Sequence, residues 1–364
     1  MSKLHNLLEP KNIVFCNFIF YIYSSLMRVL TLFILFPLIL ILSSGSGAHA
    51  FKGDKDKTVN KQDENEPLGL CKNVVGVLNP QTNFNENYIF DRSLYFNKVE
   101  ELQNVKYWRA IMNLHQDTAL MCFANSRDVI AKVCLKDWNA KDEQCKKEFK
   151  DSLRGFYHAD TACKVLITAG KKFFYDFDKA SLNFQKGIHC FIENGVDPWF
   201  AQAILLIESP NKLQKSNVGA YGSFQLMKDV ARMYGLKVNK QIDERAIFER
   251  SAYAASSLLK NICIPNTLKM LDSLKICDVN QDELWFKLLV MHVYHAGSGN
   301  VQKALFSFAP SEGSMDIIYN LWKTNVGYFK TQSQNYSQLV LAAMLEMNAR
   351  LDIRQKQLLM ATNN

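Results

Sequence analysis

Apolar residues recur every three or four positions over most of this 364-residue chain, which is the period of an amphipathic α-helix. Strand-like alternation of apolar and polar residues is absent from residues 89–177. We therefore expect an all-α protein. The helices predicted for the second half of the chain are Trp199–Glu208, Lys228–Tyr234, a helix through Ala252 to Leu259, Leu284–Tyr294, Val301–Phe308, Ile317–Phe329 and Leu339–Met347.

The helix at residues 199–208 is apolar almost all round, so we expect it to be buried. Asp197 is a typical N-cap residue, and Pro198 is typical of the first helical position. The helix ends in a single acid, Glu208, shortly before Pro210. A carboxyl group in an apolar setting keeps its proton to a higher pH and can serve as a general acid. The alternative is that Glu208 only marks the point where the helix reaches the surface.

The N-terminus has the pattern of an export signal. Two apolar runs flank Met27-Arg28, and Ala48-His49-Ala50 has the small-x-small pattern of a signal peptidase site. Translation from Met27 would give a complete signal peptide that ends at residue 50. The alternative is an uncleaved membrane anchor, because the two runs together are long enough to span a bilayer. We expect the mature protein in the periplasm or the cell envelope.

Changes in composition divide the rest of the chain into regions. Residues 51–70 are charged and polar, as in a linker. Residues 71–180 are predicted to form a helical N-terminal accessory region, residues 181–310 the helical domain that contains Glu208, and residues 311–364 a C-terminal helical extension. The accessory region suggests no chemistry of its own, and the two histidines His115 and His158 are isolated, so we expect no metal site there.

The cysteines favour an oxidising compartment. There are nine, of which Cys16 lies in the signal region, and an even number behind an export signal suggests disulfides. Cys263 and Cys277 bracket one short stretch between helices and are the pair that we expect to be bonded. The alternative is that several cysteines are small buried hydrophobes. The remaining pairings cannot be deduced from the sequence.

Composition and charge narrow the class of partner. A hydrophobic content of 48% with 21% charged residues is typical of a globular protein with a core. The net charge of +8 favours anionic partners through long-range attraction. Basic residues do not form a stripe interleaved with aromatic ones, so we expect no nucleic acid partner. An anionic cell-wall polymer and a membrane surface fit the charge equally well; membrane contact is expected only through an uncleaved N-terminal segment.

Three motifs follow one another around Glu208. The apolar helix ends in Glu208-Ser209, the second motif runs from Ser216 to Met227 as SNVGAYGSFQLM, and the third runs from Tyr294 to Val301 as YHAGSGNV. In this order and spacing they resemble the lytic transglycosylases of the SLT-domain family, which have a goose-lysozyme-like fold. The resemblance covers residues 187–308. It implies an all-α, lysozyme-like catalytic domain preceded by a helical N-terminal region.

The resemblance also implies a reaction, cleavage of the β-1,4 bond between MurNAc and GlcNAc in peptidoglycan strands. Glu208 would protonate the glycosidic oxygen and then, as a carboxylate, take the proton of the muramoyl 6-hydroxyl, which leaves a 1,6-anhydro end. One acid does both steps, unlike the two carboxylates of most glycosidases. No cofactor and no metal are implied. The residues implied to line or support the sugar cleft are Ser216, Gln225, Met227, Tyr294 and His295, with Gly219, Gly222, Gly297 and Gly299 as structural glycines.

The motifs depart from the family pattern at three positions. His295 stands where the family usually has Asn, Ser298 where it has Pro, and Phe224 where it has Met. Phe224 keeps an apolar wall, whereas His295 offers a hydrogen bond of different geometry and a charge that depends on pH.

Two other functions stay open at this point. One is a hydrolase of the same fold, similar to goose-type lysozyme. The other is a non-catalytic envelope protein that binds glycan or helps to assemble an envelope complex, which the change at His295 and the large N-terminal region keep in view. Endo or exo action and the oligomeric state are not determined by the sequence.

Overall fold

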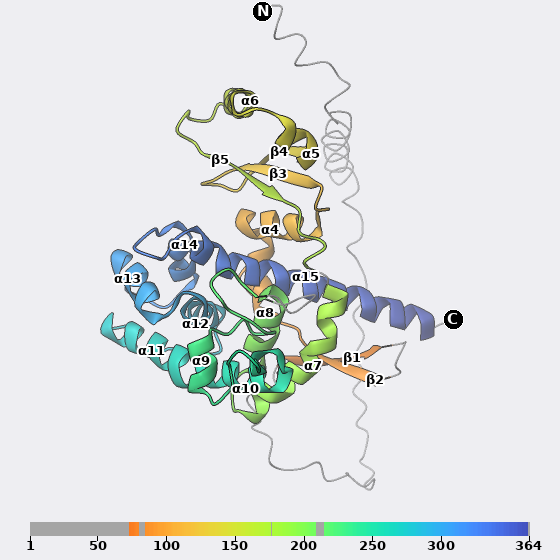
Figure 1. The fold of residues 1–364 in the computed structure, drawn as a ribbon, viewed down its shortest axis with the longest axis vertical. Coiled ribbons are helices and arrows are strands. Elements are labelled where there is room, and N and C mark those ends of the chain that lie inside the picture. Colours follow the sequence, from red (N-terminus) through yellow and green to blue (C-terminus); the bar gives the residue numbers. More distant parts are fainter. Residues whose placement is uncertain (1–72, 80–83, 176, 209–214, 363–364) are drawn as a thin grey trace, which may run out of the picture. The chain divides into compact units, whose positions relative to one another are not determined.

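The computed structural model describes residues 73–79, 84–175, 177–208 and 215–362 of the chain. These residues lie within one compact unit, residues 65–364. The predicted signal segment, the whole of the predicted linker, and Ser209 and Pro210 fall outside the described residues. The prediction of a mainly helical protein is confirmed (Figure 1).

The helical body follows the predicted pattern through most of the second half of the chain. Its first helices are α3 (Ser93–Phe96) and α4 (Gln103–Asn113), with the short η1 (Val99–Glu101) between them. The others are α7 (Phe177–Glu193), α8 (Pro198–Glu208), α9 (Lys228–Met233), η2 (Glu244–Ala246), α10 (Phe248–Leu258), η3 (Leu259–Cys263), α11 (Ile264–Ser273), α12 (Leu284–Ala296), α13 (Ser298–Phe308), α14 (Met315–Lys323) and α15 (Thr331–Thr362).

Helix α8 lies at the centre of this body, in contact with α7 and α15 (Figure 1). Every residue from Pro198 to Ile207 is buried, as the apolar pattern predicts. The predicted N-cap is present: Oδ1 of Asp197 accepts a hydrogen bond from the backbone N–H of Trp199 at 2.8 Å. The other carboxylate oxygen of Asp197 lies 2.6 Å from Nζ of the buried Lys287 on α12. These contacts fix the axis of α8 and therefore the position of its last residue.

The polar side chain of Gln202 ties α8 to a hairpin that precedes the helical body. The hairpin consists of β1 (Val74–Asn79) and β2 (Phe84–Ile89), paired antiparallel. Gln202 is fully buried, and its amide accepts from the backbone N–H of Ile89 and donates to the carbonyl of Ile89, both at 2.8 Å. These two hydrogen bonds provide partners for the backbone groups at the end of β2 and for the buried amide of Gln202.

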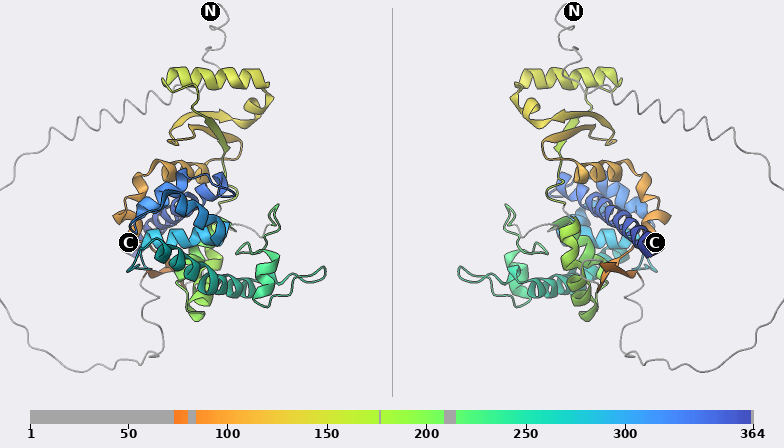
Figure 2. Two further views of the ribbon diagram at one scale, coloured as in Figure 1. Left: turned by 90° about the vertical axis from the view of Figure 1, so that its left-hand side faces the viewer. Right: turned by 90° about the vertical axis from the view of Figure 1, so that its right-hand side faces the viewer.

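The accessory region contains a second sheet, so its purely helical prediction was wrong. The strands are β3 (Thr118–Phe123), β4 (Val129–Cys134) and β5 (Val165–Ala169), in the antiparallel order β4-β3-β5. The helices α5 (Leu135–Ala140) and α6 (Glu143–Phe156) cover one face, and α4 covers the other (Figures 1 and 2).

The central strand explains why the sheet was missed. Met121 and Phe123 pack toward α5 and α6, while Leu120 and Cys122 belong to the main core on the opposite face. A strand that is buried on both faces has apolar residues at successive positions and shows no alternation.

The C-terminal extension is part of the core. One continuous helix, α15, replaces the shorter helix predicted at Leu339–Met347, and α14 ends at Lys323 instead of Phe329. Helix α15 packs on α4, α8 and α12. Its Gln338 accepts a hydrogen bond from the indole of Trp108 at 3.1 Å, and Asn348 donates to the carbonyl of Asp91 at 3.0 Å. Buried polar contacts on both sides of the helix explain its length and fixed position.

The predicted disulfide between Cys263 and Cys277 is absent, since both thiols are free in the part of the chain that is described. Cys263 faces the core from η3 with 2% of its surface exposed, whereas Cys277 is exposed beyond the end of α11. Their different surroundings correct the expectation based on spacing. The described free cysteines are Cys122, Cys134, Cys145, Cys163, Cys190, Cys263 and Cys277.

Candidate active site

The candidate site is built around Glu208, the last residue of α8. Loss of water around the carboxyl group raises the pKa of Glu208 from 4.5 to about 7, and the rise is larger than the opposing effect of a hydrogen bond from Tyr336. The rise predicted from the apolar helix is therefore confirmed. A carboxyl group with this pKa is partly protonated near neutral pH and can both give and take a proton.

Tyr336 of α15 is the hydrogen-bond partner of this acid. Its hydroxyl donates to Oε1 of Glu208 at 2.9 Å, and the residue is 4% exposed. A donor to the ionised carboxylate stabilises the charged form, which limits how far burial raises the pKa of Glu208. Tyr336 was not predicted as a site residue, because a single tyrosine in the polar stretch TQSQNYSQ carries no local signal.

Two further tyrosines interact electrostatically with Glu208. Burial and the Glu208 carboxylate raise the pKa of Tyr294, on α12, and of Tyr175, which precedes α7. The Tyr294 hydroxyl donates to the carbonyl of Phe224 at 2.6 Å, so α12 is joined to the second sequence motif. The structure thus brings the predicted Tyr294 near the predicted acid, and adds Tyr175 and Tyr336 from outside the three motifs.

The second motif forms a compact loop, residues 215–227, called here the glycine loop. The hydroxyl of Ser216 accepts from the backbone N–H of Ala220 at 2.9 Å, which holds the first turn. Gly219 and Gly222 have φ of 90° and 86°, conformations that residues with a side chain rarely adopt. At Gly222 a Cβ atom would lie 2.0 Å from the carbonyl oxygen of Arg245, so this position also requires glycine for space.

Gln225 and Met227 lie at the end of the glycine loop. Gln225 has φ of 47°, and its amide donates to the carbonyl of Gly222 at 3.0 Å. A non-glycine residue in this region is strained and persists only where its surroundings hold it. Met227 is 44% exposed at the N-cap position of α9. Both side chains are therefore placed by the loop, and their predicted contacts with sugar remain predictions.

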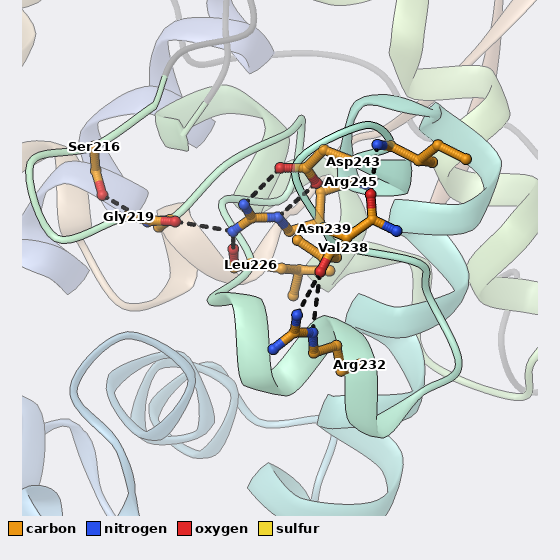
Figure 3. Close-up of polar contacts among 10 residues, drawn as sticks. Ser216, Gly219, Leu226, Arg232, Val238, Asn239, Asp243 and Arg245 are labelled. Atoms are coloured by element: carbon orange, nitrogen blue, oxygen red, sulfur yellow. Dashed lines mark hydrogen bonds and ion pairs between the residues drawn. The ribbon is translucent and has the colours of Figure 1, made fainter.

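Arg245 binds the backbone of the glycine loop through its guanidinium group (Figure 3). The guanidinium is 3% exposed and binds both carboxylate oxygens of Asp243, at 2.8 and 2.7 Å. It also donates to the carbonyls of Gly219 and Leu226, at 2.9 and 2.8 Å. Two of these four bonds tie the backbone of the loop at Gly219 and Leu226 to one buried cation, and the other two hold that cation in place through Asp243. No role for Arg245 was predicted from the sequence, because it lies outside the three motifs.

The side chain of Phe224 packs inside the hydrophobic core and does not form the apolar wall of the cleft that the sequence suggested. It is fully buried, stacks on Phe191 with ring centroids 5.6 Å apart and lies against Phe248 at the same distance. Only its backbone carbonyl, which accepts from Tyr294, contributes to the site. The substitution of Phe for Met at this position therefore acts on packing.

The third motif forms the end of α12 and the start of α13. His295 is an exposed residue on the last turn of α12, and its ring stacks on Tyr336. Gly297 has φ of 79° and lies between the two helices, as its prediction as a structural glycine requires. Gly299 and Ser298 lie in the first turn of α13, where Gly299 has ordinary helical geometry and no conformational need for glycine.

Residues 192–309 match a protein family described as Transglycosylase SLT domain. The match supports a transglycosylase domain of this family over these residues, and with it a lytic transglycosylase that acts on peptidoglycan. No curated protein and no solved structure matches the chain. Glu208, the glycine loop, Tyr294 and His295 lie inside the matched residues, whereas Tyr175 and Tyr336 lie outside them.

Two other findings concern the described residues alone. They contain no group of three or more His, Cys, Asp or Glu side chains placed to hold a metal ion. None of the helices described here is both long enough and apolar enough to cross a bilayer.

Proposed function

We propose that the protein is an exported lytic transglycosylase that cleaves the MurNAc–GlcNAc β-1,4 bond of peptidoglycan, with Glu208 as general acid and then general base. The observation that carries the proposal is the pKa of Glu208, raised to about 7 by burial at the end of α8. A group with this pKa can donate and accept a proton at the same working pH.

In the first step, Glu208 gives its proton to the glycosidic oxygen as the bond to the anomeric carbon of the muramic acid breaks. GlcNAc leaves with a free 4-hydroxyl group. The muramoyl 6-hydroxyl then attacks the anomeric carbon, and the Glu208 carboxylate takes the proton of that hydroxyl. The product is a 1,6-anhydro end, no water is consumed, and Glu208 regains its starting state.

The electrostatics around Glu208 support the use of one acid. Hydrolytic glycosidases place a second carboxylate within about 10 Å of the first, as a nucleophile or as the base for water. Among the described residues no second carboxylate acts on the pKa of Glu208, and residues 209–214 contain neither Asp nor Glu. An internal nucleophile that returns its proton to Glu208 needs no such second group.

Ser216, Gln225, Met227 and Tyr294 are the residues proposed to meet the glycan strand, and His295 lies at the same site, stacked on Tyr336. The glycine loop lies between α8 and α9 in sequence, and Tyr294 binds it from α12. The apolar runs before Ala48-His49-Ala50 support export to the periplasm or cell envelope. The proposed partner is the peptidoglycan strand, with an envelope protein complex as a further partner.

Digestion of purified cell wall tests the reaction. Mass analysis of the wild-type digest should find muropeptides with 1,6-anhydro ends; reducing muramic ends would instead indicate a lysozyme-type hydrolase. Glu208→Gln should abolish release while wall binding is kept, because glutamine fits the same space and has no proton to give at this pH. The matched control is Glu193→Gln, since Glu193 is an exposed carboxylate on α7. If the wild-type protein and both variants bind wall but release nothing, the protein is the non-catalytic alternative.

A further inference from the structure

The ring of His295 covers the tyrosine that binds the candidate acid. The imidazole and the Tyr336 ring are stacked, with centroids 4.1 Å apart and planes 21° from parallel. Tyr336 is 4% exposed, whereas His295 is an exposed residue, so the imidazole lies on the solvent side of the phenol. Stacked aromatic rings attract each other beyond the area that they bury. The contact therefore restrains the ring whose hydroxyl reaches Glu208.

The backbone beneath His295 is held in place. The N–H of Gly297 donates to the carbonyl of Val293 at 2.9 Å, and the Asn300 amide donates to the carbonyl of Ala296 at 2.8 Å. These bonds satisfy carbonyls that the end of a helix leaves free. The imidazole is thus presented from a fixed helix end and not from a loose loop.

One turn earlier, α12 is tied to α15 next to Tyr336. The Nε2 atom of the buried His292 lies 2.8 Å from the hydroxyl of Ser337, and the indole of Trp322 donates to the same hydroxyl at 2.8 Å. Burial and the nearby His295 lower the pKa of His292 to about 3, so His292 is a neutral hydrogen-bonding group at neutral pH. The register between the two helices is therefore fixed where His295 meets Tyr336.

We propose that His295 is a positioning residue that acts through Tyr336, because its stacked ring holds the phenol in the place where it donates to Glu208. This role rests on the proposed function and adds to it. Packing against Tyr336 removes water from one face of the ring and lowers the pKa of His295, so at neutral pH the ring stacks as an uncharged group.

Three substitutions separate stacking from hydrogen bonding. His295→Ala removes the ring, His295→Asn keeps a hydrogen-bonding group without a ring, and His295→Phe keeps a flat ring without a hydrogen bond. His189→Ala is the matched control, because His189 is an exposed histidine on α7 that pairs with Glu193. Thermal melts establish that each variant is folded before it is assayed.

The first readout is kinetic. His295→Ala and His295→Asn should lower kcat about fivefold to tenfold with KM unchanged, which is the size of one lost aromatic contact. His295→Phe should restore kcat, and His189→Ala should behave as the wild type. If His295→Phe is as slow as His295→Ala, or if the loss falls on KM, His295 acts on the substrate by hydrogen bonding and the positioning role is wrong.

The second readout does not need activity. An NMR titration of a ¹³C-labelled Glu208 carboxyl group should show its pKa rising in His295→Ala and His295→Asn toward the value in Tyr336→Phe, and staying at the wild-type value in His295→Phe. An unchanged pKa in His295→Ala would contradict the inference even in an active enzyme. Failure of the proposed function would appear separately: the variants would show these pKa shifts, but the wild-type protein would release no anhydro product.

Discussion

The hydroxyl of Tyr336 donates a hydrogen bond to Oε1 of Glu208 at 2.9 Å, although the two residues are 128 positions apart in the sequence. Tyr336 lies on α15, beyond the residues that match the SLT family, and Glu208 lies within them. The matched segment alone therefore does not contain all the groups that set the chemistry of the acid. The long C-terminal helix completes the site.

Removal of that hydroxyl should change both the rate and its dependence on pH. The hydrogen bond stabilises the ionised carboxylate and lowers the pKa of Glu208, so Tyr336→Phe should raise that pKa above about 7. The basic limb of the pH–rate profile should then move to higher pH. Because one charge-assisted hydrogen bond is lost, kcat/KM should fall about tenfold at its optimum.

Measurement of kcat/KM across the pH range, with wall lysis as the assay, checks this prediction. Tyr328→Phe is the control, because Tyr328 is 83% exposed and should leave the profile unchanged. A basic limb that stays in place or moves to lower pH in Tyr336→Phe would show that the phenol does not act on the ionisation of Glu208.

The raised pKa of Glu208 should also appear in the stability of the protein. A group whose pKa is raised on folding contributes stability that is fully present below its unfolded pKa, here 4.5, and lost as pH rises through its folded pKa of about 7. Glu208→Gln has no proton to lose, and its amide oxygen can still accept from Tyr336. Relative to the wild type, the variant should therefore gain about 3 kcal/mol in free energy of unfolding as the pH rises from 4.5 through about 7, and it should keep this gain at higher pH.

Urea unfolding of both proteins at pH 4.5 and pH 8 measures this difference. The exposed carboxylate Glu312 provides the matched control, since Glu312→Gln should give the same free energy of unfolding as the wild type at both pH values. A Glu208→Gln variant whose relative stability does not change with pH would mean that burial does not shift this carboxyl group.

The parts of the fold that sequence could predict depend on neighbours in the chain. Asp197 and Pro198 mark the start of α8 by local capping chemistry, and the structure places the helix start there. The acid at the end of α8 follows from the apolar run before it. Gly222 and Gly297 follow in the same way from turns that only glycine allows.

The parts that sequence could not predict depend on contacts between distant residues. Leu120 to Phe123 are apolar in succession because both faces of β3 are covered, and this pattern does not distinguish a strand from a helix. The contact from Tyr336 to Glu208 arises only when α15 packs on α8. The spacing of Cys263 and Cys277 suggested a bond, but one thiol faces the core and the other faces solvent.

The two glycines of the glycine loop should differ sharply in their tolerance of alanine. Gly219 and Gly222 have similar positive φ, so both substitutions introduce backbone strain of about 1–3 kcal/mol. At Gly219 no atom lies within 4 Å of an added Cβ, whereas at Gly222 the Arg245 carbonyl oxygen would lie at 2.0 Å. Gly222→Ala should therefore lose more free energy of unfolding than Gly219→Ala, by about 2 kcal/mol or more. Urea unfolding of the pair measures this difference, and equal losses would mean that the loop is free to move away from Arg245.

Arg245 should be required for the glycine loop, and lysine should not replace it. The guanidinium binds Asp243 through two bonds and two backbone carbonyls of the loop through two more. A lysine has one nitrogen at the end of a flexible stem and cannot reach these acceptors together. Arg245→Lys should therefore lower the free energy of unfolding by about 3 kcal/mol, because it leaves buried polar groups unpaired.

The matched substitution is Arg250→Lys, since Arg250 pairs with Glu244 nearby but has 43% of its side chain exposed. Exposed pairs contribute less than about 1 kcal/mol, so this variant should unfold almost as the wild type does. Limited proteolysis tests the loop itself. Chymotrypsin is the suitable protease, because it can cut the loop at Tyr221 and Phe224. Arg245→Lys should be cut there faster than Arg250→Lys under native conditions. Equal rates together with equal stabilities would show that the loop holds its shape without the buried guanidinium, and that Gly222 and Gln225 are enough to fix it.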